Sequence, residues 1–230
     1  MVPILYNGHQ EQSSIQDRGC LISVYVRKAI GHLVDNEKGA RMLKKIHYNA
    51  PVTLSFAFLS LAALLLGQIT GNQTTWLLFS VGPGGPTDVL FYFRLFGHIL
   101  GHSGWDHYFS NFLLILLLGP LMEDRYGSKN LLFMILGTAL VTGLVHVVLF
   151  DTTVLGASGI VFMLIMLSAF VNIREGRIPL TVLLVAAAYI GQEVYTGMFT
   201  SDNISQFSHI AGGACGCVFG FTMRGGGRKR

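Results

Sequence analysis

Charged residues are scarce in this chain of 230 residues, because Asp, Glu, Lys and Arg together make up only 12% of it. A soluble domain carries about 25%. Hydrophobic residues make up 51% of the chain, and the mean hydropathy is +0.54. This composition argues against an ordinary soluble domain and predicts an all-α integral membrane protein, since a helix satisfies its own backbone hydrogen bonds in lipid.

Cysteine is also scarce. The three cysteines, Cys20, Cys215 and Cys217, do not suggest a disulfide framework. Cys215 and Cys217 lie two residues apart on one predicted helix and point in different directions, so we expect both to act as small packing residues. The metalloprotease motif HExxH is missing as well, because Ile99 follows His98 where the motif requires glutamate.

Six apolar segments approach the roughly 20 residues that a membrane-spanning helix needs. They cover residues 51–70, 107–121, 131–150, 158–173, 180–198 and 207–223. The second and fourth are short, and we expect them to start inside protein rather than at the lipid surface. With six spans, 15 of the 16 Lys and Arg residues fall on one side of the membrane and only Arg94 on the other. The positive-inside rule then predicts that both termini are cytoplasmic.

Three regions follow from this topology. Residues 1–47 form a charged cytoplasmic segment, in which apolar residues at helical spacing between positions 22 and 34 predict a short helix on the membrane surface. A soluble mini-domain or a partner-binding helix is the alternative for this segment. Residues 48–223 form the six-helix domain, and residues 224–230 are a basic cytoplasmic tail. The net charge of +4 therefore reflects topology and contact with the lipid bilayer, and we expect no nucleic-acid partner.

Between the first two spans, residues 71–97 combine aromatic side chains with the turn-rich run Gly82-Pro83-Gly84-Gly85-Pro86. We expect this connection to lie in the membrane interface.

The start of the fourth span carries a candidate nucleophile. Ser158 stands in Gly156-Ala157-Ser158-Gly159, where the unpaired N–H groups of a first helical turn can stabilise an oxyanion. The alternative is that Ser158 only caps the helix beside a patch of small residues.

A candidate base lies in the sixth span. His209 precedes Gly212, Gly216 and Gly220, which recur every four residues and form a smooth groove for close helix packing. His209 lies near the face of this groove, so we expect it to point at the neighbouring helix. If that helix begins at Ser158, a serine–histidine contact is geometrically reasonable. The alternative is a histidine bonded to a backbone carbonyl.

The third cluster precedes and begins the second span. His107 and Asn111 are four residues apart, share one helix face and can both donate hydrogen bonds to an oxyanion. His98 and His102 have the same spacing, and we expect all four to line a water-filled cavity open to the outside. A metal site of His98, His102 and His107 is the rival interpretation, but our expectation is that no metal is bound.

Taken together and in this order, these segments resemble the rhomboid intramembrane serine proteases over roughly residues 91–220. Gly119 to Gly127 is similar to the family's GxxxExxxG pattern and includes Glu123 and Arg125, to which we assign a structural role. Arg94 resembles the arginine of the family's loop-one motif. Phe162 stands where many bacterial members have a tyrosine stacked on the histidine.

The resemblance implies a six-helix bundle in the plasma membrane of a bacterium, with a catalytic dyad of Ser158 and His209, no triad aspartate and no cofactor. It also implies an oxyanion site made by His107, Asn111 and the Ser158 N–H. Transmembrane proteins would be the substrates, cut near the outer face of the bilayer. The main alternative is an inactive member that binds transmembrane helices as an adaptor or chaperone. A transporter is less favoured, because the polar residues gather toward one face.

Overall fold

A computed structural model describes residues 48–84, 87–174 and 203–223, together with positions 180, 183–184, 187–188 and 191. The chain divides into two units, Met1–Tyr48 and Asn49–Arg230, and the helices described here belong to the second. The predictions for the segment 1–47 and for the basic tail 224–230 fall outside the described residues.

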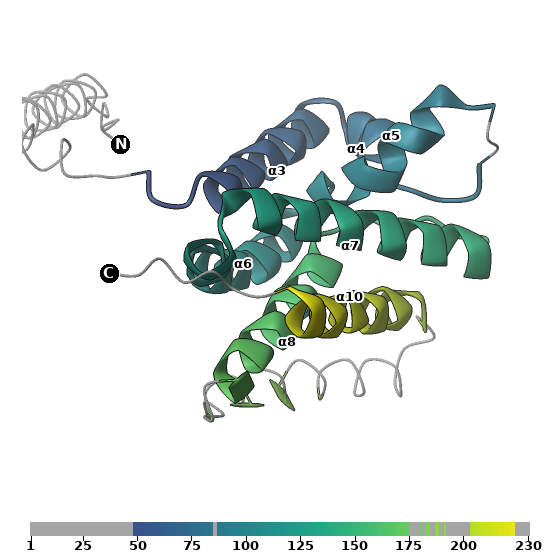
Figure 1. Ribbon diagram of the computed structural model, residues 1–230. Helices are drawn as coiled ribbons and strands as arrows, with labels where there is room; N and C mark the ends of the chain where they lie inside the picture. Colours follow the sequence, from purple (N-terminus) through teal and green to yellow (C-terminus); the bar gives the residue numbers. More distant parts are fainter. Residues whose placement is uncertain are drawn as a thin grey trace, which may run out of the picture. The chain divides into compact units, whose positions relative to one another are not determined.

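Five of the six predicted spans correspond to long helices (Figure 1), while most of the fifth span along the chain, residues 180–198, lies outside the described part of the chain. Two of the five, α3 and α7, are long and apolar enough to cross a membrane by length and composition. The five helices are α3 (Pro51–Ile69), α6 (Trp105–Tyr126), α7 (Ser128–Leu149), α8 (Ser158–Arg174) and α10 (Asn203–Thr222).

The second predicted span, residues 107–121, lies within a helix that is longer than its apolar run. Helix α6 has 22 residues and continues through Pro120 to Tyr126. The apolar pattern ends near residue 121 because the last turn carries Glu123, Asp124 and Arg125. The helix continues because the Glu123 carboxylate is buried against the start of α3, where backbone N–H groups bind it.

The connection between α3 and α6 contains three short helices, which the turn-rich sequence did not indicate. It contains α4 (Gln73–Leu78), α5 (Val89–Gly97) and the 3₁₀ helix η1 (His98–Leu100). Asp88 caps α5 by accepting a 2.9 Å hydrogen bond from the Leu90 N–H. Arg94 donates to the Leu77 carbonyl over 2.7 Å and lies 3.2 Å from the Asp88 carboxylate. The Arg94 side chain thereby ties α5 to the end of α4.

Helix α8 lies in the interior of the described bundle, in contact with α6, α7 and α10. Nearly every residue from Gly159 to Leu167 is buried, on all sides of the helix. By contrast, α3, α6, α7 and α10 each expose large apolar side chains on one side, as lipid-facing helices do. A helix enclosed by protein does not need the full length of a lipid-exposed span, which accounts for the short apolar run of the fourth segment.

Candidate active site

The start of α8 lies against the ring of His107. Gly156 precedes Ser158 by two residues and has φ of +126°, a conformation that favours glycine. A Cβ atom at Gly156 would lie 2.7 Å from His107 Nε2, closer than any side chain could tolerate. Gly156 therefore lets the backbone before Ser158 approach the His107 imidazole directly. Ser158 itself is half-buried as the first residue of α8.

Helices α8 and α10 touch through their backbones. A Cβ atom at Gly212 would collide with the carbonyl of Gly159, and one at Gly216 with the carbonyl of Met163. At Gly220 the added atom would lie 2.7 Å from the side chain of Phe170. The three glycines that recur every four residues thus all face α8, and their lack of side chains permits the close approach.

His209 lies on the face of α10 that meets the first turns of α8. Its side chain is buried, and its ring stacks on Phe162 with 4.6 Å between ring centres and 8° between the planes. Phe162 lies one turn after Ser158 on the same face of α8. The Ser208 carbonyl lies 3.4 Å from the position of a Cβ atom on Gly159. Ser158 and His209 therefore lie at the same level on facing sides of one helix pair.

His107 is held from two sides on α6. Its Nδ1 lies 3.2 Å from the hydroxyl oxygen of Ser103, and its backbone carbonyl accepts a 2.9 Å hydrogen bond from the amide of Asn111. When the Ser103 hydroxyl donates to Nδ1, Nε2 carries the ring proton and faces Gly156. The sequence prediction did not single out Ser103, although its i, i+4 relation to His107 was a usable signal.

The loop before Ser158 is hydrogen-bonded to three other segments of the chain. Val81 and Val154 exchange two backbone hydrogen bonds of 2.9 and 2.8 Å, and the Gly156 N–H donates to the His98 carbonyl over 2.9 Å. From α7, His146 Nε2 donates to the Thr152 carbonyl over 2.8 Å. His146 was missed by the sequence analysis. A histidine in the middle of an apolar span was the available signal, because such a side chain needs a partner.

His98 and His102 are buried, and each lies within hydrogen-bond distance of a hydroxyl group. His98 Nε2 lies 3.3 Å from the Thr142 hydroxyl, and His102 Nδ1 lies 3.1 Å from the Ser60 hydroxyl. Burial, reinforced by the neighbouring His107, lowers the pKa of His102 to about 3, so this ring is neutral at physiological pH. Their role in lining a water-filled cavity stays a prediction. The residues that the structure describes include no group of three His, Cys, Asp or Glu side chains placed to hold a metal ion.

Glu123 joins α6 to the first turn of α3. Its carboxylate accepts hydrogen bonds of 2.9 Å from the Val52 and Thr53 N–H groups and of 2.8 Å from the Thr53 hydroxyl. The negative charge also complements the positive end of the α3 dipole. Arg125 is half-buried in the same last turn of α6.

The described fold is helical, and its exposed apolar faces surround a buried site in which a serine at a helix start lies on the helix face that meets a histidine. These features define a class of helical membrane protein with a polar site between its helices. A family model described as the Rhomboid domain matches residues 91–226, more than half of the chain. The chain therefore belongs to the rhomboid family and is an integral membrane protein, which confirms the resemblance inferred from its motifs.

Proposed function

We propose that this protein is an intramembrane serine endopeptidase that cuts transmembrane protein substrates near the outer face of the bilayer. In this proposal the chain spans the plasma membrane of a bacterium six times, with both termini in the cytoplasm. The observation that supports the proposal is the direct packing of α8 on α10, with His209 stacked on Phe162 one turn after Ser158.

The chemistry needs only these two side chains and water. His209 takes the proton from the Ser158 hydroxyl as its oxygen bonds to the carbonyl carbon of the scissile peptide bond. Collapse of the tetrahedral intermediate breaks the C–N bond, and the leaving amine takes the proton from His209. Water then attacks the acyl-enzyme, gives a proton to His209, and releases the new carboxyl end of the substrate while Ser158 regains its proton.

Charge develops on the substrate's carbonyl oxygen in both steps, and the start of α8 is suited to receive it. The Ser158 N–H belongs to the first helical turn, whose N–H groups have no partner within the helix. His107 Nε2 faces the neighbouring Gly156 and supplies a second donor in the tautomer described above. One N–H of the Asn111 amide binds the His107 carbonyl, and the amide has a second N–H to offer.

The stacked ring of Phe162 supports the proposed base. A ring parallel to His209 at 4.6 Å restricts the rotation of the imidazole and keeps it directed along the face of α8 that carries Ser158. The hydroxyl of the tyrosine found in many bacterial relatives is not needed for this packing.

Labelling with a fluorophosphonate probe tests the proposal, because the probe forms a covalent bond only with an activated serine. We expect the purified protein to be labelled, and Ser158→Ala and His209→Ala to remain unlabelled while keeping their thermal stability in detergent. A folded wild-type protein that takes up no probe would identify the chain as the alternative, an inactive member that binds transmembrane helices.

A further inference from the structure

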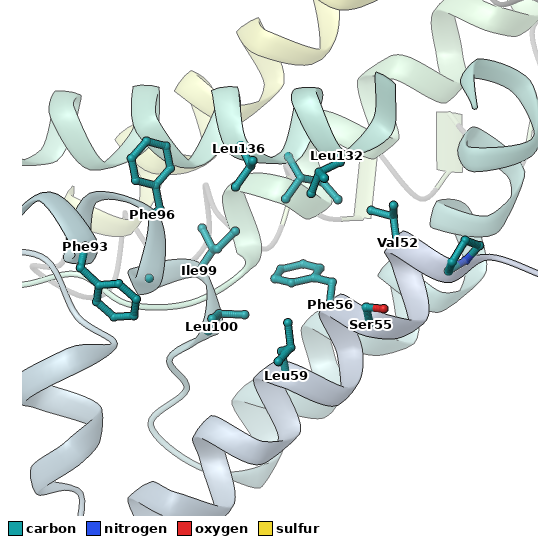
Figure 2. A pocket seen from close by; sticks show the side chains of 13 residues that line it. Val52, Ser55, Phe56, Leu59, Phe93, Phe96, Ile99, Leu100, Leu132 and Leu136 are labelled. Carbon is teal, nitrogen blue, oxygen red and sulfur yellow. The ribbon is translucent and has the colours of Figure 1, made fainter. Parts of the chain in front are cut away.

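A cavity of about 420 Å³ lies between α3, α7 and the connection formed by α5 and η1. Figure 2 shows that side chains from these three elements converge on it, with Val52 and Leu132 at one end and Phe93 and Phe96 at the other. Its lining comprises Pro51, Val52, Ser55, Phe56, Leu59, Phe93, Phe96, Gly97, Ile99, Leu100, Leu132, Ile135 and Leu136. None of these residues belongs to the proposed catalytic machinery.

The lining restricts the occupant to hydrocarbon. Ser55 is the one residue with a polar side chain among the residues that line the cavity, and the others are aliphatic, aromatic or glycine. Apart from the Ser55 hydroxyl, the lining side chains give a water molecule no hydrogen-bond partners. The volume falls within the roughly 300–1,000 Å³ range of ligand-binding pockets. In a membrane protein, an apolar space of this size between helices suits the acyl chain of a lipid.

A positively charged residue, Lys129, lies in the first turn of α7, one turn before the part of α7 that lines the cavity. Lys129 lies three residues before Leu132 and seven before Leu136, so the three side chains share one face of α7. Lys129 is exposed and forms no hydrogen bond or ion pair with the residues that the structure describes. Its long aliphatic stem can follow the apolar surface while the ammonium reaches the headgroup region.

A molecule with both an apolar chain and a negatively charged group would fit the hydrophobic cavity and the Lys129 ammonium at the same time. We propose that the cavity binds one acyl chain of an anionic glycerophospholipid, whose phosphate lies at Lys129. The lipid belongs to the leaflet at the α3 and α7 starts, which is the cytoplasmic leaflet in the proposed topology. That leaflet is rich in anionic lipid, and a lysine near its surface contributes enough binding energy to change affinity about fivefold.

A crosslinking experiment with the full chain tests this site. The protein is placed in phosphatidylcholine vesicles that contain a minority of phosphatidylglycerol with a photoreactive diazirine near the end of one acyl chain. Mass spectrometry then maps the labelled peptides. We expect labelling to concentrate on the α3 segment that contains Phe56 and Leu59. The Lys129→Gln variant should need about fivefold more probe for the same labelling, and Lys129→Arg should restore the wild-type value.

Two tryptophan variants on α7 provide a matched pair. Leu136 and Leu144 are almost equally exposed, at 42% and 41%, but only Leu136 lines the cavity. We expect Leu136→Trp to remove most of the labelling of the α3 segment and Leu144→Trp to leave it unchanged. If Leu136→Trp does not fold, the probe concentration that Lys129→Gln needs for labelling tests the proposed lipid site. Labelling spread evenly over the exposed helix faces, unchanged labelling in both Leu136→Trp and Lys129→Gln, or displacement of the lipid by a second copy of the chain would each overturn the proposal.

Discussion

The two sides of the bundle are joined in opposite ways. On the side of α8 and α10, the two backbones are in direct contact. Gly212 and Gly216 of α10 pack against the backbone of α8, which is possible because glycine has no side chain. On the side of α3 and α6, the contact is made by specific side chains. The Glu123 carboxylate binds the first turn of α3, and the Tyr108 hydroxyl donates to the Ala57 carbonyl over 3.0 Å.

This difference suggests how the protein tolerates change. A backbone contact has no flexible atom that can move aside, so any added atom alters the spacing of the whole helix pair. A contact made by side chains can lose one hydrogen bond and keep its spacing. We therefore expect substitutions between α8 and α10 to affect catalysis and stability together, and substitutions between α3 and α6 to affect mainly stability.

Among substitutions at the contacts between helices, the largest effect on probe labelling is expected from Gly212→Ala. The new methyl group would collide with the Gly159 carbonyl, push α10 away from α8 and separate His209 from Ser158. Overpacking of this kind costs about 1–3 kcal/mol of stability, and we expect probe labelling of Ser158 to be lost. Thermal unfolding in detergent and fluorophosphonate labelling measure the two effects on the same sample.

Gly213→Ala is the matched control for that variant. A Cβ atom at Gly213 would make an ordinary 3.6 Å contact with Met166. Because alanine favours a helix over glycine by about 1 kcal/mol, this variant should be at least as stable as the wild type and fully labelled. Equal behaviour of the Gly212 and Gly213 variants would show that the backbone contact between α8 and α10 does not control the site.

His107→Ala is expected to give the next largest effect. Removal of one oxyanion donor typically lowers kcat by about 10²–10³ with little change in substrate binding. Asn111→Ala should have a smaller effect, because its amide already holds the His107 carbonyl and acts partly through that residue. Steady-state cleavage of a transmembrane reporter in detergent gives kcat and KM separately. An unchanged kcat in the double variant would remove both residues from the mechanism.

Glu123→Ala tests the other side of the bundle. The variant loses three hydrogen bonds to α3, and a single bond to a charged group contributes about 1.5–3 kcal/mol. We expect a clear fall in the unfolding temperature, while the fraction that remains folded takes up the probe normally. Loss of labelling in protein that is still folded would contradict the contrast between the two sides.

Ser103→Ala is expected to have the smallest effect. It removes the exposed hydroxyl that lies 3.2 Å from His107 Nδ1, and a neutral hydrogen bond of this kind contributes about 0.5–1.5 kcal/mol. Turnover should fall by about two- to tenfold, because Nε2 is then no longer favoured as the protonated nitrogen. Unchanged turnover would mean that Ser103 does not set the tautomer of His107.

The residues of the candidate site could be selected from the sequence because membrane helices carry few polar residues without a partner or a function. Ser158, His209, His107 and Asn111 stand out in apolar surroundings, and the glycine spacing marks the face of α10 that meets a neighbour. The ends of the helices were harder to predict. Helix α6 extends beyond its apolar pattern because the Glu123 carboxylate is bound by backbone N–H groups of α3, about 70 positions earlier in the chain.

The connection between α3 and α6 shows a second limit. Its glycine and proline residues indicate turns correctly, but the short helices α4 and α5 depend on contacts made after folding. Arg94 secures α5 through the Leu77 carbonyl, 17 positions away, and no periodic pattern in the sequence records such a bond. His146 was overlooked for a similar reason, since its partner is a backbone carbonyl in the following loop.

The central claim is that Ser158 and His209 act as one catalytic pair across the contact between α8 and α10. The most direct test measures cleavage of a single-span reporter protein by the purified enzyme in vesicles, for the wild type, Ser158→Ala and His209→Ala. The account predicts cleavage by the wild type and a fall to background in both variants, since loss of a nucleophile or base costs on the order of 10⁶ in rate. Cleavage by either folded variant at a rate near that of the wild type would contradict it.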